Sequence, residues 1–142
     1  MPLIADHTIT VTNRYYDGAL DRDTALETDI SGVSFYNSSV QSVQGDGLKS
    51  ADVYRIRIFA NSSILTATRR DGGPDQEAVG LPAEDTYVPA KTWAEMGDED
   101  KAKHWTLKAG DRISCDGVDV TILSVRDNRG HRVNPHWYVE GK

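Results

Sequence analysis

Apolar and polar residues alternate through the C-terminal third of the chain, and this alternation is the feature that most limits how the chain can fold. Residues 111–115 and 118–125 both alternate, and the Asp-Gly dipeptide between them favours the tight turn of a β-hairpin. A second turn signal, residues 127–130, leads into the aromatic and apolar run 135–140. Because successive side chains of a strand point to opposite faces, the sequence predicts three consecutive antiparallel strands.

Three earlier segments, residues 7–12, 30–36 and 53–59, show the same period. The middle segment alternates through Val33 and Phe35, or through Tyr36 if a β-bulge lies near Gly32. Together with the C-terminal strands they predict an all-β fold, a small antiparallel barrel or sandwich with long loops and one short helical segment. The residues expected in its core are Ile9, Val11, Ile56, Ile58, Trp93, Trp105, Ile113, Ile122, Val125 and Trp137.

The length of 142 residues fits a single domain that spans residues 1–142. Residues 19–29 are charged and weakly patterned, which indicates a hairpin end or a loop. Residues 37–50 are rich in Ser, Gln and Gly, and a mobile loop or a long flexible hairpin is expected there. We also expect an insertion loop at about 61–86, followed by a helical segment at about 89–103 that a proline opens.

The charge and the apolar pattern exclude several classes of protein. The chain carries 22 acidic and 16 basic residues, and a net charge of -6 opposes sequence-independent binding to duplex DNA. It contains neither a basic and apolar leader nor a run of about 18 apolar residues, so neither export nor membrane spanning is expected. Its single cysteine, Cys115, cannot form an internal disulfide and is expected to be a small apolar residue of a strand.

Catalytic and metal-binding motifs find no support in the residue spacing. His104, His131, His136 and Cys115 lack the close pairing of zinc ligands. The acidic group at residues 95–100 lies where acids favour a helix start, and it lacks the donor pattern of a calcium loop. Phosphate-binding loops and nucleophile elbows are also missing from the sequence. The sequence therefore predicts no enzyme, with no catalytic, cofactor or metal site.

The strand at residues 53–59 places arginines on its polar face. Arg55 and Arg57 alternate with buried-type isoleucines, and a guanidinium group pairs well with carboxylates. We therefore expect contacts between subunits there rather than a platform for single-stranded nucleic acid, which needs a basic groove with stacking aromatics. Other residues expected at a subunit or partner interface are Arg69, Arg70 and Asp71, and those expected in a channel or partner loop are Leu48 and Lys49.

Several elements resemble a family of small prophage structural proteins and, more broadly, the head-tail joining proteins, called stopper or closure proteins, of tailed bacteriophages. The broad likeness lies in the strand at 7–11, the strand at 54–58 and the closing unit at 110–127. The narrower likeness lies in residues 13–16 (Asn-Arg-Tyr-Tyr), 87–89 with Trp93, 104–107 (His-Trp-Thr-Leu), 125–129 (Val-Arg-Asp-Asn-Arg) and 136–137 (His-Trp). The segments at 61–84 and 89–103 are additional to the usual stopper pattern.

The resemblance implies a subunit of a ring, typically of six copies, in the neck of a virion assembled in the bacterial cytoplasm. Such a ring lies between the portal with its adaptor and the tail, and it retains the packaged DNA, which passes through without sequence recognition. Alternatives are another virion component, such as a tail terminator, a tail-proximal protein or a capsid decoration protein, or a small barrel that binds single-stranded nucleic acid.

Overall fold

The computed structural model describes residues 6–17, 22–44, 47–69, 76–77, 81–130 and 133–142. Six strands form a closed antiparallel barrel in the order β1, β2, β3, β7, β6 and β5, and β5 pairs again with β1. This confirms the predicted all-β fold and identifies it as a barrel. The strands are β1 (His7–Asp17), β2 (Arg22–Gln44), β3 (Gly47–Arg69), β5 (Arg112–Cys115), β6 (Val118–Asp127) and β7 (His136–Gly141), and the short β4 (Gln76–Glu77) pairs with β3 outside the ring.

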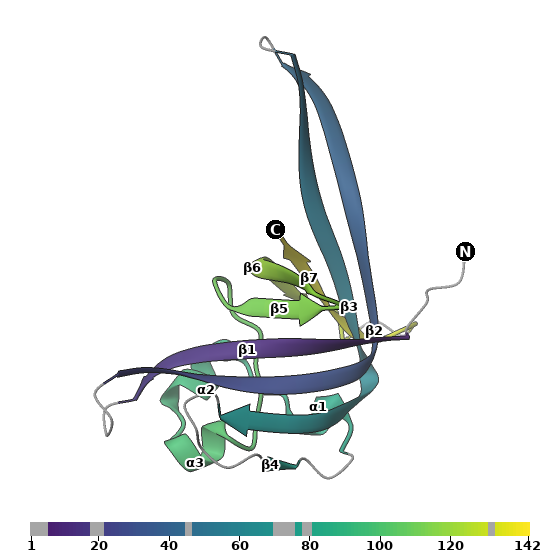
Figure 1. The fold of residues 1–142 in the computed structure, drawn as a ribbon. Coiled ribbons are helices and arrows are strands. Elements are labelled where there is room, and N and C mark those ends of the chain that lie inside the picture. The colour runs from purple at the N-terminus through teal and green to yellow at the C-terminus, as the bar shows by residue number, and fades with distance from the viewer. Residues whose placement is uncertain (1–5, 18–21, 45–46, 70–75, 78–80, 131–132) are drawn as a thin grey trace.

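Two long hairpins leave the barrel, because β2 and β3 are much longer than the barrel wall (Figure 1). We call the β2–β3 hairpin beyond the barrel the arm; it comprises residues 37–44 of β2 and 47–54 of β3. The second hairpin joins β1 and β2 and pairs as far as Asp17 opposite Arg22. Within residues 37–50, for which a mobile loop or a long flexible hairpin was expected, the described residues 37–44 and 47–50 therefore belong to a hairpin.

A bulge at Gly32 bends β2 between these two hairpins. The pairing of β2 with β3 skips Gly32, whose positive φ of 76° suits a residue without a Cβ atom. The Ser62 hydroxyl donates a hydrogen bond of 2.9 Å to the Gly32 carbonyl and fixes the opposite strand. The arm leaves the barrel beside this bend. In Figure 1 it extends toward the top of the picture, whereas the β1–β2 hairpin extends to the left. Of the two alternatives for residues 30–36, the one with a bulge near Gly32 is therefore the one present.

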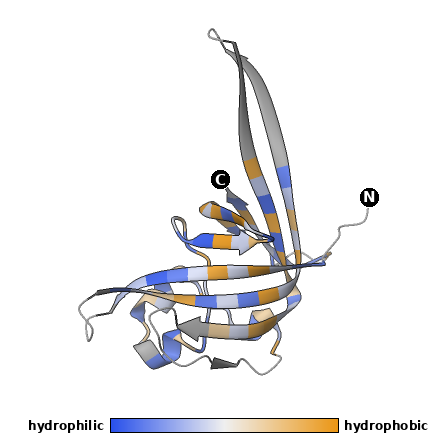
Figure 2. Cartoon of the chain, viewed as in Figure 1, coloured by the Kyte–Doolittle hydropathy of each residue, from blue (hydrophilic) through white to orange (hydrophobic). Residues whose placement is uncertain are grey.

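The core lies inside the barrel, where inward-facing side chains of all six strands meet. Hydrophobic residues gather at the middle of β1 and β2 and give way to polar ones toward the end of the β1–β2 hairpin (Figure 2). Of the residues predicted for the core, Val125 is only half-buried and packs against the cluster, whereas the others are buried. The inward alternation of β3 is confirmed by Ile56 and Ile58, which are fully buried.

A segment of short helices covers one side of the barrel (Figure 1). It contains α1 (Ala83–Thr86), α2 (Ala90–Glu95) and α3 (Asp98–Lys101), and the last two lie within the predicted helical segment at 89–103. Trp105 anchors the segment: it is fully buried, its indole N–H donates to the Ala83 carbonyl at 3.1 Å, and its ring packs edge-on against Tyr87 and Trp137.

Two segments contain more strand than expected, namely the hairpin end or loop at 19–29 and the insertion loop at about 61–86. Residues 22–29 belong to β2, where Thr24, Leu26 and Thr28 are buried in alternation. Residues 61–69, expected to begin an insertion at about 61–86, continue β3, in which Ser62 and Ile64 are buried. The prediction underestimated the strands at both places because it counted only large apolar residues. Thr and Ser also fill inward positions of a strand: the Ser62 hydroxyl donates to the Gly32 carbonyl, whereas the buried Thr24 hydroxyl has no hydrogen-bond partner among the described residues.

A buried polar cluster joins β1 to the chain that enters β5. The Asn13 amide donates to the Thr106 carbonyl at 2.8 Å and to the Asp111 carboxylate at 3.1 Å. The Lys108 ammonium lies 3.5 Å from the same carboxylate. Burial raises the pKa of Asp111, while its hydrogen bond from Asn13 and the charge of Lys108 oppose that shift. The cluster satisfies polar groups that the closure of the barrel removes from water.

Replacing Asp111 with alanine should reduce the free energy of unfolding by about 1–3 kcal/mol, because the Asn13 amide and the Arg14 N–H lose a buried acceptor. Chemical denaturation followed by tryptophan fluorescence measures this loss. Asp111→Asn, which keeps one acceptor oxygen, should lose less. Equal losses in the two variants would contradict the assignment of Asp111 as a hydrogen-bond acceptor.

Candidate interaction surface

The arm has unpaired outer strand edges over residues 37–44 and 47–53. β1 pairs with β2 only up to Val33, and β7 pairs with β3 only from Tyr54 onward. Among the described residues, the outer edges of residues 37–44 and 47–53 therefore pair with no further strand. A two-stranded ribbon is marginally stable by itself, and its free N–H and C=O groups can pair with another strand. The arm is thus a surface suited to strand addition.

A second surface lies at the root of the arm, on the outer face of β3, β7 and β6. The strand register places Tyr36, Arg55 and Glu140 in one row across the sheet. It places Arg57, Tyr138 and Arg126 in a second outward row. The row between them points inward and contains Ile56 and Val139, both buried. We call these six outward residues the arginine patch: Tyr36, Arg55, Arg57, Arg126, Tyr138 and Glu140.

Arg57 is held at the centre of the arginine patch by two tyrosines. Its guanidinium donates a hydrogen bond of 2.8 Å to the Tyr36 hydroxyl and lies 5.7 Å from the centre of that ring. It also lies 5.0 Å from the centre of the Tyr138 ring, whose hydroxyl donates to Glu140 at 2.8 Å. Such cation–π contacts orient a guanidinium group without neutralising its charge.

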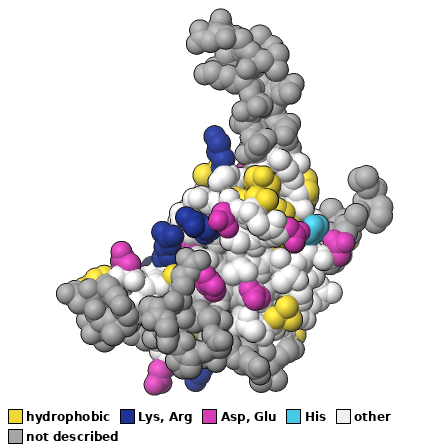
Figure 3. Space-filling view, in the orientation of Figure 1, with side chains coloured by type: hydrophobic (Ala, Val, Ile, Leu, Met, Phe, Trp, Pro, Cys, Tyr) yellow, Lys and Arg dark blue, Asp and Glu magenta, His cyan; other side chains and the backbone are white. Residues whose placement is uncertain are grey.

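The pKa values of the two tyrosines in the patch shift in opposite directions. The hydrogen bond from Arg57 holds the pKa of Tyr36 below its ordinary value, with smaller contributions from Arg55. Burial raises the pKa of Tyr138, and the nearby Glu140 carboxylate adds to that shift. The patch combines three guanidinium groups with one carboxylate and therefore attracts anionic groups. On the face shown in Figure 3, by contrast, acidic side chains are scattered among basic and uncharged ones.

The structure brings together only some of the residues predicted for an interface. Arg55 and Arg57 lie in the arginine patch. Arg69 ends β3, but its side chain, like residues Arg70 and Asp71, lies outside the described residues. Leu48 and Lys49 belong to the β3 strand of the arm, and their side chains are likewise outside the description.

Sequence reasoning missed Tyr36, Arg126, Tyr138 and Glu140. Alternation alone places such residues on the polar face of their own strands. Which polar faces are adjacent depends on the order of the strands around the barrel, in which β7 lies between β3 and β6. The sequence therefore indicates which face of each strand is polar, but it does not indicate which polar faces become neighbours in the barrel.

Two of the histidines considered for a zinc site, His104 and His136, make local contacts with main-chain carbonyls. The Nδ1 atom of His104 lies 2.8 Å from the Asp100 carbonyl, and that of His136 lies 2.6 Å from the Asn134 carbonyl. Cys115 is buried on β5, and His131 is outside the described residues. In the part of the chain that the structure describes, no three His, Cys, Asp or Glu residues are grouped so that they could hold a metal ion.

Cys115 should react slowly with thiol reagents while the protein is folded. Burial raises the pKa of its thiol to about 11, and the neighbouring Asp116 carboxylate adds to the shift. At pH 8 we expect labelling by iodoacetamide to be at least about 100-fold slower in native protein than in denaturant, because the thiolate fraction is so small. Mass spectrometry of timed samples measures both rates.

The same shift predicts a dependence of stability on pH. The folded pKa is raised, so the contribution of Cys115 is fully present below the unfolded pKa of about 8.5 and is lost as the pH rises through about 11. The free energy of unfolding of the wild type should fall across this window relative to Cys115→Val. Rapid labelling at pH 8, or parallel pH curves for the two proteins, would contradict the shift.

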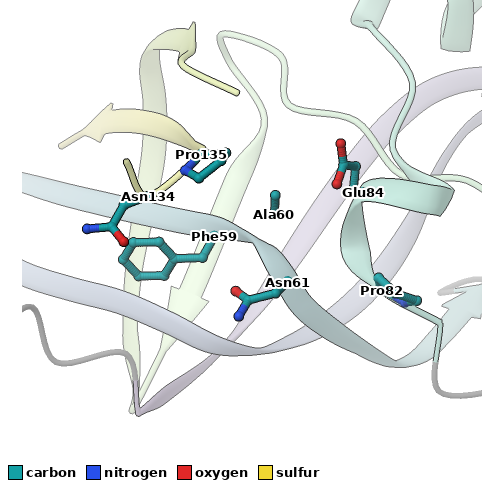
Figure 4. A pocket seen from close by; sticks show the side chains of 7 residues that line it. All are labelled: Phe59, Ala60, Asn61, Pro82, Glu84, Asn134 and Pro135. Atoms are coloured by element: carbon teal, nitrogen blue, oxygen red, sulfur yellow. The ribbon is translucent and has the colours of Figure 1, made fainter. Parts of the chain in front are cut away.

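An open cleft of about 500 Å³ lies between the middle of β3, α1 and the start of β7. The Phe59 side chain and Asn134 lie at one end, while Glu84 projects from α1 at the other (Figure 4). Among the described lining residues only Glu84 is titratable. The cleft therefore offers amide and carboxylate oxygens beside an aromatic ring, without a paired acid and base.

The fold and its two surfaces define a small closed β-barrel with a projecting two-stranded arm. Residues 4–142 match the family described as Family of unknown function (DUF6751), and the chain belongs to that family. No curated protein and no solved structure matches the chain. Within the described part, no helix has the length and apolar character needed to cross a membrane.

Proposed function

We propose that this protein is a structural, non-enzymatic subunit of a bacteriophage virion. Its place would be the head-tail connector, as a stopper or closure ring that joins the portal and adaptor to the tail and retains packaged DNA. The observation that carries the proposal is the arm, whose free edges can pair with strands of neighbouring copies. The resemblance of the sequence to head-tail joining proteins supports this position in the virion over that of the other virion components.

The charge of the chain also fits this role. A net charge of -6 favours a channel wall along which DNA slides without binding. The arginine patch does not offer good stacking surfaces for bases, because the Arg57 guanidinium lies over the rings of both Tyr36 and Tyr138. A single-stranded nucleic-acid module is therefore the weaker alternative, and a filter-binding assay at low salt tests it.

Sedimentation of the purified protein tests the proposal. A closed ring of identical copies, expected to be a hexamer, should appear as one species that dissociates on dilution. Protein that stays monomeric at high micromolar concentration would contradict the ring. Particles induced from a strain that carries the gene should show density for this chain in the neck, and its absence from purified particles would contradict the virion role.

A further inference from the structure

The arginine patch has an excess of positive charge that no carboxylate among the described residues balances by an ion pair. Glu140 is its single carboxylate and already accepts a hydrogen bond from Tyr138. Arg126 is exposed on β6, whereas Arg55 and Arg57 are half-buried on β3, and the buried Nε atom of Arg55 has no hydrogen-bond partner among the described residues. Planar guanidinium groups on a rigid sheet are suited to bind carboxylates in two-point contacts. The surface therefore fits a partner with several exposed carboxylates.

This chain carries such a group of carboxylates on α2 and α3. Glu95, Glu99 and Asp100, which we call the acidic segment, are all exposed. None of the three has an ion-pair partner among the residues that the structure describes. Lys101 does not balance them, because it is buried: its ammonium donates to the Met96 carbonyl at 2.8 Å and lies 5.5 Å from the centre of the Trp93 ring.

The two surfaces lie on different sides of the subunit. In Figure 1, α2 and α3 lie at the lower left below β1, whereas β7 and the root of the arm lie above β1, nearer the centre of the picture. Two different, complementary surfaces on one chain produce a head-to-tail contact, and such a contact closes into a ring when the rotation between copies allows it. A patch that met its own copy would instead place like charges opposite one another.

We propose that the arginine patch of one copy binds the acidic segment of a second copy, which makes this the charged subunit contact of the ring. The inference rests on the proposed function and specifies the two surfaces that meet. The exposed Lys91 and Lys103, which flank the acidic segment, then lie at the rim of the contact. Because the contact is charged, raising the salt concentration should weaken assembly.

Charge reversal on each side tests the contact. The triple variant R55E/R57E/R126E and the triple variant E95K/E99K/D100K should each weaken assembly by at least about 100-fold in sedimentation, because like charges then meet. A 1:1 mixture of the two should recover assembly, since each reversed surface finds its opposite on the other chain. That recovery should produce rings with alternating chains. A chain that carries all six changes should assemble by itself.

Two further variants separate the contact from a folding defect. Arg126→Glu changes an exposed side chain and should weaken assembly by about tenfold at an unchanged melting temperature. Arg112→Glu makes the same charge change on β5, outside the patch, and should leave assembly unchanged. The inference would be overturned if both triple variants assembled as the wild type does, or if mixing them did not restore assembly.

The failure of this inference can be told apart from failure of the proposed function. Assembly that needs the arm but ignores both charge reversals would overturn the patch contact alone. A wild-type chain that never assembles would overturn both. A contact in which the patch meets its own copy would leave E95K/E99K/D100K assembling as the wild type does, because that variant keeps an unchanged patch.

Discussion

Replacing residues 38–53 with Asn-Gly should abolish assembly while the barrel still folds. The change joins Asn37 to Tyr54, which already face each other across the hairpin, through a dipeptide that favours tight turns. It removes the unpaired edges of the arm and leaves the paired barrel strands and the core intact. We expect a monomer in sedimentation, with the association at least about 100-fold weaker, because main-chain pairing supplies much of the affinity of strand addition.

A shorter deletion provides the control for this experiment. Replacing residues 44–47 with Asn-Gly shortens only the tip and keeps most of the arm edges, so assembly should persist. The melting temperatures of both variants should stay close to that of the wild type. A truncated chain that assembles as the wild type does would show that the arm is dispensable, and the observation that carries the proposed function would be lost.

Replacing Trp105 with alanine should destabilise the barrel by about 3–5 kcal/mol, the range for removal of a large buried aromatic side chain. Trp105 is fully buried, packs against Tyr87 and Trp137, and donates to the Ala83 carbonyl. The substitution leaves a cavity and a carbonyl without its donor. Such a loss is a large part of the stability of a domain of this size. Urea denaturation measures it.

A pair of phenylalanine substitutions separates packing from hydrogen bonding. Trp105→Phe removes the bond to Ala83, whereas the buried indole N–H of Trp137 has no acceptor among the described residues. Trp105→Phe should therefore cost about 1 kcal/mol more than Trp137→Phe. Equal costs would contradict a contribution of the Trp105 hydrogen bond to stability.

The strands with large inward residues were predictable, and those with hydroxyl residues were not. Ile56 and Ile58, or Ile113 and Cys115, mark the buried face of a strand in any register. Thr24 and Thr28 do not, since a threonine fits a turn, a loop or an inward strand position equally well. Sequence reasoning therefore missed part of β2 and the end of β3.

Part of the interaction surface was likewise predictable from the sequence, and part of it was not. The outward position of Arg55 and Arg57 follows from alternation within β3. Their association with Arg126 and Tyr138 does not, because β6 and β7 lie some seventy to eighty residues later in the chain and any of several strand orders would satisfy the same alternation. The burial of Lys101 was also not predicted, because it depends on contacts with the Trp93 ring and the Met96 carbonyl.

The sequence by itself determined the class of fold, the inward set of large apolar residues and the outward direction of the arginines, because period-two alternation is a local property of each strand. Only the tertiary structure decided that the barrel closes through the pairing of β5 with β1, that the arm extends beyond β7, and that the arginine patch assembles. Closure and register depend on contacts between residues far apart in the chain, and the local pattern carries no information about which strands become neighbours.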